Sequence, residues 1–306
     1  MKQDYYIIDV FTKRPFNGAQ IAVFPHADGL NASIMQLLAR ELNLSETVFI
    51  SKSKNENITR RLHVYSPTKE INFAGPPIIA SAYVLACIND IKLEKKYTDV
   101  ILEENIGAIE VNILQEQGKP ELIQFKLKSQ PIIDNYVPME DQLANMLSLE
   151  ESDIEKLKYQ TMLVSADQPY LIIPIRTFDA VRKAKFNYSS WSQSIAPVCM
   201  AKDMFLFSTQ SDIDASNFHA RLLGPEIGIN EDPPIASAMP AFTGYLCGHD
   251  NVASGRHTFM IDRGMETTRK SILSIEMDNN ENKENIIRVG GPAIMVGKGT
   301  ISIPEC

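Results

Sequence analysis

The segment Pro77-Ile78-Ile79-Ala80-Ser81-Ala82 is the most informative part of the sequence, because it returns in the second half of the chain as Pro233-Pro234-Ile235-Ala236-Ser237-Ala238. The two hexapeptides agree at every position except the second, with no gap. Matching turn-to-helix segments roughly half a chain apart indicate two halves of similar structure. We therefore expect the two helix starts to meet where the halves meet, in a cleft that serves as the functional site.

The length of 306 residues suits two domains of ordinary size. Residues 134–138 are polar and contain a proline, as a linker does. We place the boundary just before them, which gives an N-terminal half, 1–130, and a C-terminal half, 131–306. The last strands are free to cross back to the first half.

The net charge of -8 argues against a nucleic-acid partner, because phosphate binding needs clustered Lys and Arg. No apolar run approaches the roughly 20 residues of a membrane span, and the first residues lead into a strand without a signal-peptide core. We expect a cytoplasmic protein that binds a small-molecule substrate and has neither nucleic-acid nor membrane partners.

The sequence predicts no metal site. Its four cysteines form no CxxC pair and have no histidine at ligand spacing: Cys87, Cys199, Cys247 and Cys306. The acidic segment that begins at Asp278 resembles a calcium loop, but Lys283 stands where the turn glycine belongs and Val289 where the bidentate Glu belongs.

Strand-like segments dominate the pattern. Residues 5–11 and 21–24 are typical of a hairpin around the turn Pro15-Phe16-Asn17-Gly18. The further predicted strands are 60–65, 100–114, 122–127, 162–165, 170–175, 205–208 and 218–222, and further helical segments are expected at 139–146 and 152–158. Strands with a few helices place the chain in the α+β class.

The first helix is predicted from Ser33, which forms a capping box with Gln36, to a stop near Asn43. A strand follows at 47–50. This arrangement places Glu46 on a tight helix-to-strand connection, which is a typical place for a catalytic side chain. The alternative is that Glu46 is an exposed loop carboxylate.

The second helix start is limited by Pro240, since a proline inside a helix costs about 3 kcal/mol but is tolerated in the first turn. We therefore expect this helix to begin near Ser237, with Ser81 at the equivalent place in the first half. Both serines become candidate N-caps that face the cleft. The alternative is that they cap helices and bind nothing.

Several motifs occur in order along the chain: Asp9-Val10-Phe11-Thr12, Pro15-Phe16-Asn17-Gly18, Asn43-Leu44-Ser45-Glu46-Thr47, Phe73-Ala74-Gly75, Phe218-His219-Ala220-Arg221, Glu231-Asp232-Pro233 and Val289-Gly290-Gly291. This series resembles the PhzF family of phenazine-biosynthesis isomerases, which share the diaminopimelate epimerase fold. The resemblance implies two pseudo-symmetric domains, each a β-barrel-like sheet wrapped around a central helix. It also implies an isomerase that needs no cofactor and forms a homodimer.

The resemblance assigns catalytic roles to Glu46, as general acid and base, and to Asp232 in the cleft. Proton abstraction next to an unsaturated system needs a base whose pKa is raised by desolvation, so we expect a raised pKa for Glu46. Asp232 has the alternative of capping a turn. The expected substrate-binding residues are Ser81, Ser237, Gly75 and Gly18.

The chain departs from the family pattern at both helix starts. Where the family reads FAGHPT followed by a glycine, Pro76 replaces the histidine, Ile78 the threonine and Ala80 the glycine; Ile235 and Ala236 replace Thr and Gly at the second start. These changes remove polar groups and close backbone approach. We expect slow turnover at best of the phenazine precursor trans-2,3-dihydro-3-hydroxyanthranilate. The alternative function is a catalytically silent relative that binds a small ligand or a protein partner in the cleft.

Overall fold

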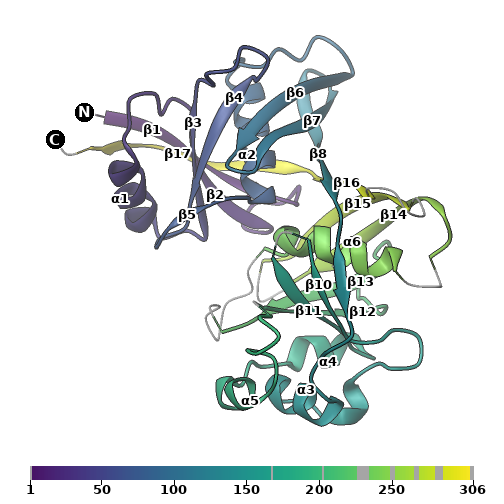
Figure 1. Ribbon diagram of the computed structural model, residues 1–306. Coiled ribbons are helices and arrows are strands. Elements are labelled where there is room, and N and C mark those ends of the chain that lie inside the picture. The colour runs from purple at the N-terminus through teal and green to yellow at the C-terminus, as the bar shows by residue number, and fades with distance from the viewer. Residues whose placement is uncertain are drawn as a thin grey trace. The chain divides into compact units, whose positions relative to one another are not determined.

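The computed structural model describes residues 2–166, 168–201, 203–225, 234–248, 252–264, 269–279 and 285–303. The chain divides into two compact units: unit 1 comprises Met1–Leu127 and Arg288–Cys306, and unit 2 comprises Lys128–Ile287. The strands β8 (Lys119–Ser129) and β16 (Asn285–Gly291) run through the two points where the chain passes between units (Figure 1). The chain therefore ends in the unit in which it begins.

Unit 1 contains β1 (Lys2–Val10), β2 (Ala19–Phe24), α1 (Ala32–Leu42), β3 (Glu46–Ser51), β4 (Arg60–Tyr65), β5 (Glu70–Ile71), α2 (Gly75–Cys87), β6 (Tyr97–Glu104), β7 (Gly107–Glu116) and β17 (Ala293–Ser302), with parts of β8 and β16. Its hydrogen-bonded strands follow the order β17, β1, β2, β3, β4, β6, β7, β8 and β16. The predicted hairpin is confirmed, because β1 and β2 pair antiparallel around the turn at 15–18.

Helix α2 is the central helix of unit 1. Its residues from Gly75 to Ala82 are all buried, and it packs against β1, β2, β3 and β17 (Figure 1). A helix that is apolar on all sides belongs in a core. It begins at Gly75, with Pro76 and Pro77 in the first turn, where the missing N–H groups cost no helical hydrogen bond. The expected start near Ser81 is therefore wrong.

Helix α1 covers the outside of the unit 1 strands. Asn31 is its N-cap, and its side chain accepts the backbone N–H of Ile34 at 2.9 Å. The predicted cap at Ser33 is wrong by two residues. The predicted end is confirmed, because Asn43 adopts the left-handed conformation with φ 50°. The inner face of α1, with Met35 and Leu38, packs in a cluster with Phe24 and Phe49 of the strands beneath.

Unit 2 contains β9 (Ile132–Asp134), α3 (Glu140–Leu147), the 3-10 helix η1 (Glu151–Asp153), β10 (Met162–Ser165), β11 (Pro169–Pro174), α4 (Phe178–Lys183), α5 (Tyr188–Gln193), β12 (Asp203–Ser208), β13 (Phe218–Leu223), the 3-10 helix η2 (Ala236–Ala238), α6 (Met239–Cys247), β14 (Gly255–Arg263) and β15 (Ser271–Asn279). From β10 to β15 the neighbouring strands pair antiparallel, parallel, antiparallel, parallel and antiparallel. In unit 1 the series β1, β2, β3, β4, β6 and β7 shows the same succession.

Helix α6 is the buried helix of unit 2. The ring of Phe242 lies 4.8 Å from that of Phe205, 5.0 Å from Phe207 and 5.3 Å from Phe218, measured between centroids. Aromatic pairs at such distances add about 0.5–1.5 kcal/mol each to the burial of their surface. This cluster holds α6 against β12 and β13. Among the residues that the structure describes, no helix has the length and apolar character needed to cross a membrane.

Two predicted segments have a different structure. The single strand expected at 100–114 is two strands, β6 and β7, because residues 105 and 106 form a tight turn before Gly107, which has φ 115°. The helix expected at 152–158 is limited to η1. Beyond it, the carboxylate of Glu155 accepts the backbone N–H groups of residues 156–158 at 2.6–3.0 Å, and this local bonding competes with helix formation.

Candidate functional site

Glu46 is the first residue of β3, directly after the connection that leaves α1. The parallel pairing of β3 with β2 sets Glu46 opposite Ile21. The side chain is partly buried as a whole, but its Oε2 atom is shielded from solvent and has no hydrogen-bond partner among the described residues. Burial raises the pKa of Glu46 to about 8. The expected raised pKa is confirmed, and the exposed-loop alternative is wrong.

Glu104, the last residue of β6, is a second buried carboxyl in unit 1 and is 1% exposed. Its Oε2 accepts the backbone N–H of Ala74 at 3.0 Å, while its Oε1 has no hydrogen-bond partner in the described part of the chain. Burial raises its pKa well above the usual range, and the charge on Glu46 raises it further. Unit 1 therefore contains two buried carboxyls, and the charge on Glu46 opposes ionisation of Glu104.

Sequence reasoning missed Glu104. The signal that could have revealed it is the alternation of β6, in which Leu102 and Glu104 share the buried face and Glu103 lies on the other side. A glutamate at an inward position of an otherwise apolar face is uncommon.

The start of α2 has few groups that could bind a ligand's carboxylate. Ala74 is the N-cap and has no side-chain cap, and its own N–H is used by Glu104. Pro76 and Pro77 have no N–H to donate. Gly75, the first helical residue, is buried. The usual anion-binding ability of a helix N-terminus is therefore reduced here.

Gly18 has a structural reason to be glycine. Its φ of +69° lies in the left-handed region, and a Cβ atom at this position would meet the backbone oxygen of Val10 at 2.1 Å. The carboxylate of Asp9 fixes the same turn by accepting the N–H of Phe16 at 2.6 Å. The turn explains this glycine without a bound ligand.

The two serines have different surroundings. Ser81 lies inside α2, fully buried, with no hydrogen-bond partner for its hydroxyl among the described residues, so it does not cap the helix. Ser237 lies in η2, directly before α6, and the hydroxyl of Tyr170 is 3.5 Å from its own, at the limit of a hydrogen bond. Asp232 lies outside the described residues.

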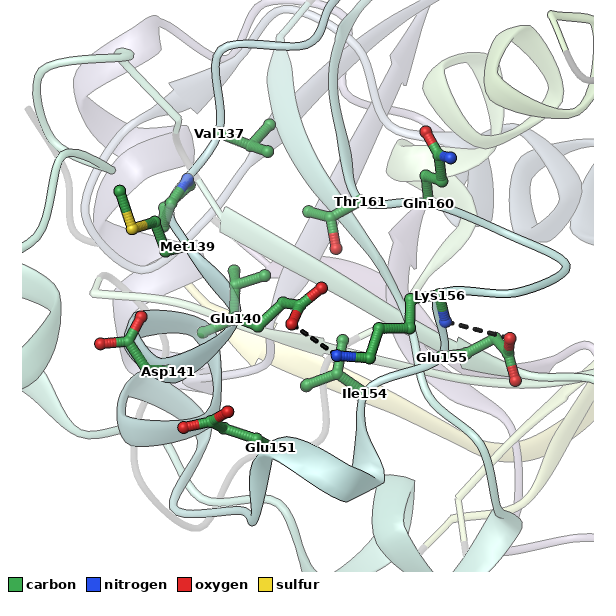
Figure 2. Close-up of a pocket in the computed structure, with 12 residues that line it drawn as sticks. Val137, Met139, Glu140, Asp141, Glu151, Ile154, Glu155, Lys156, Gln160 and Thr161 are labelled. Atoms are coloured by element: carbon green, nitrogen blue, oxygen red, sulfur yellow. Dashed lines mark hydrogen bonds and ion pairs between the residues drawn. The ribbon is translucent and has the colours of Figure 1, made fainter.

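Unit 2 also has a surface pocket of about 890 Å³, between the start of α3 and residues 151–161 (Figure 2). Lys156 crosses it and pairs with Glu140 at 2.6 Å. None of the expected site residues that the structure describes lines this pocket. Its charged side chains are solvated, so it lacks a buried carboxyl oxygen like that of Glu46. Within the described residues, no group of three or more His, Cys, Asp or Glu side chains could hold a metal ion.

Comparison with known proteins identifies the group to which the chain is related. The family model for phenazine biosynthesis-like proteins, PhzC-PhzF, matches residues 8–299, and the chain belongs to this family. An uncharacterised isomerase of Clostridium acetobutylicum is 28% identical over 304 residues, which cover 98% of this chain and 98% of that protein. The trans-2,3-dihydro-3-hydroxyanthranilate isomerase of Pseudomonas chlororaphis is 26% identical over 304 residues, with coverage of 97% and 98%.

The fold agrees with this family. A phenazine biosynthesis protein of the PhzF family from Bacillus anthracis superposes with a TM-score of 0.84 at 18% identity, covering 99% of this chain and 100% of that chain. At an identity this low, the superposition supports the fold alone. That fold is the PhzF fold, with mixed strand pairing and few helices.

Proposed function

We propose that this chain is a PhzF-like isomerase that needs no cofactor and shifts a proton between two carbons of a small, cyclic or carboxylated metabolite. Glu46 acts as the acid and the base. The observation that supports this most directly is the buried Oε2 of Glu46, with a pKa raised to about 8. Such a group changes protonation state close to neutral pH, as a proton shuttle must.

The reaction requires one group to do two things in turn. The charged form of Glu46 removes a proton from a carbon next to an unsaturated system, and the electron pair of that C–H bond moves into the conjugated bonds. The protonated Glu46 then returns the proton to another carbon of the same system. The redox state of the substrate does not change, and the charged carboxylate of Glu46 is regenerated.

The substrate differs from that of the Pseudomonas relative. That protein is named for trans-2,3-dihydro-3-hydroxyanthranilate, whereas here Pro76 and Pro77 withdraw N–H donors from the first turn of α2, and Ile78 is apolar. Positioning supplies a large share of an enzyme's rate, so retaining the base alone is not enough. We expect turnover of this compound far below that of the named isomerase.

Proton exchange with solvent is the experiment that tests the proposal. The purified protein is incubated in D₂O with trans-2,3-dihydro-3-hydroxyanthranilate and a panel of cyclic, unsaturated carboxylic acids, and deuterium uptake is read by mass spectrometry. At least one panel member should gain deuterium, Glu46→Gln should abolish the uptake, and the exposed helix variant Glu41→Gln should retain it. Equal uptake by wild type and Glu46→Gln would contradict the proposed role.

A catalytically silent relative that binds a small ligand or a protein partner is the second candidate. The start of α2 has few free backbone N–H donors, so a carboxylated substrate would be held by fewer hydrogen bonds. This observation favours the silent relative. The same panel separates the two functions: a compound that raises the melting temperature without gaining deuterium supports binding alone.

A further inference from the structure

Glu104 is a buried carboxyl that the proposed proton transfer does not use. It shares the inward face of β6 with Leu102, which is fully buried, and one of its oxygens receives the N–H of Ala74 at 3.0 Å. The other oxygen is buried and lacks a hydrogen-bond partner within the described residues. A buried polar atom of this kind calls for an explanation, since native structures contain few of them.

Glu104 is influenced by groups on three neighbouring elements: Glu46 on β3, Arg61 on β4 and the N–H of Ala74 at the start of α2. Arg61 and Ala74 favour the charged carboxylate, but burial is the largest influence and, with Glu46, favours the neutral acid. A charged Glu104 would leave a buried carboxylate oxygen without a partner among the described residues, so the burial of this side chain favours its neutral form.

We propose that Glu104 is a positioning residue for Glu46: it stays a neutral acid, ties the end of β6 to the start of α2, and leaves the negative charge of the working site on Glu46. The inference rests on the proposed function for the role of Glu46. Two charged carboxylates in this buried region would repel each other, whereas a neutral partner leaves Glu46 free to gain and lose its proton. The acid proton of Glu104 also provides a donor near a helix start where Pro76 and Pro77 provide none.

Three variants of β6 separate charge from structure. Glu104→Gln keeps a neutral group with an oxygen that can accept the Ala74 N–H, and Glu104→Leu removes that acceptor. The matched control is Glu103→Gln, which neutralises the neighbouring carboxyl on the other face of the strand. In the wild-type protein the Glu103 carboxylate accepts a hydrogen bond from the Ser53 hydroxyl at 2.9 Å. The readouts are the titration midpoint of Glu46, by NMR of ¹³C-labelled carboxyls, and amide hydrogen exchange at Ala74.

Glu104→Gln should leave the Glu46 midpoint and the protection of the Ala74 amide unchanged. Glu104→Leu should speed exchange at Ala74 by about tenfold or more, because the amide loses its acceptor. Glu46→Gln should lower the midpoint of Glu104, and Glu103→Gln should change neither readout. If Glu104→Gln lowers the Glu46 midpoint by about one pH unit or more, Glu104 is the charged member and the proposal is wrong. Normal exchange at Ala74 in Glu104→Leu would overturn the positioning role.

These measurements need no substrate, so the two proposals can fail separately. If the variants give the expected Glu46 midpoints but the protein exchanges no substrate proton, the proposed isomerase activity is refuted and the proposed role of Glu104 stands. An active chain in which Glu104→Gln shifts the Glu46 midpoint refutes the inference alone.

Discussion

Glu46 and Glu104 lie on different strands of unit 1, yet the charge on Glu46 raises the pKa of Glu104. Burial is the larger cause for both carboxyls, and it acts in the same direction. The fold therefore keeps two acids protonated at a pH where ordinary glutamates are charged. The free energy of unfolding therefore falls as pH rises above the ordinary glutamate pKa, and that loss can be measured.

The pH dependence of stability should reveal Glu46. Its pKa rises from 4.5 to about 8 on folding, so the folded state holds a proton that the unfolded state has lost between these pH values. Stability therefore falls as pH rises through this window, by up to about 5 kcal/mol, and Glu46→Gln removes that loss. In urea unfolding, the free energy of unfolding of Glu46→Gln should rise relative to that of wild type between pH 5 and pH 8. Glu41→Gln, on the exposed face of α1, should show no such change. A difference between Glu46→Gln and wild type that is the same at both pH values would refute the burial of this charge.

The turn at Gly18 should tolerate no side chain. Gly18→Ala places a Cβ atom 2.1 Å from the oxygen of Val10 in a left-handed conformation, and we expect it to lower the free energy of unfolding by about 3 kcal/mol or more. Gly29→Ala is the control, since Gly29 also has a positive φ, +88°, but its Cβ would meet nothing within 4 Å. That variant should cost only about 1 kcal/mol. If chemical denaturation shows equal losses of stability for Gly18→Ala and Gly29→Ala, the contact between the new Cβ atom and the oxygen of Val10 is relieved and the prediction is wrong.

The N-terminus of α1 provides a test of the cap assignment. Asn31→Ala removes the acceptor of the Ile34 N–H and should destabilise the protein by about 1 kcal/mol. Ser33→Ala changes an exposed residue inside the first turn and should stay within about 0.5 kcal/mol of wild type. Thermal unfolding of both variants tests the assignment. A larger loss of stability in Ser33→Ala than in Asn31→Ala would support the capping box expected from the sequence.

Local patterns predicted much of unit 1 because their causes are local. The β-branched and aromatic residues of 5–11 predict β1, and the left-handed Asn43 ends α1 near the predicted place. The start of α2 expected near Ser81 is wrong because it rests on equivalence with the second helix start, which Pro240 limits. In α2 the paired prolines at Pro76 and Pro77 are themselves the start signal.

The candidate site could be predicted from the sequence only where a motif marks it. Glu46 was identified from its place in Asn43-Leu44-Ser45-Glu46-Thr47, and its raised pKa followed from the expected burial. Glu104 was not, because its role depends on contacts between residues far apart in the sequence: β6 must pair with β4, and Ala74 must reach the strand end. The alternation of β6 marks Glu104 as an inward-facing residue, but it does not encode those two contacts.

Titration of the Glu46 carboxyl tests directly whether Glu46 is a buried acid with a pKa near neutral pH. Protein labelled with ¹³C at glutamate carboxyls is titrated by NMR from pH 4 to pH 10, and the Glu46 signal is assigned by its loss in Glu46→Gln. We expect a titration midpoint of about 8. A midpoint at or below 4.5, the ordinary value for the side chain, would contradict it.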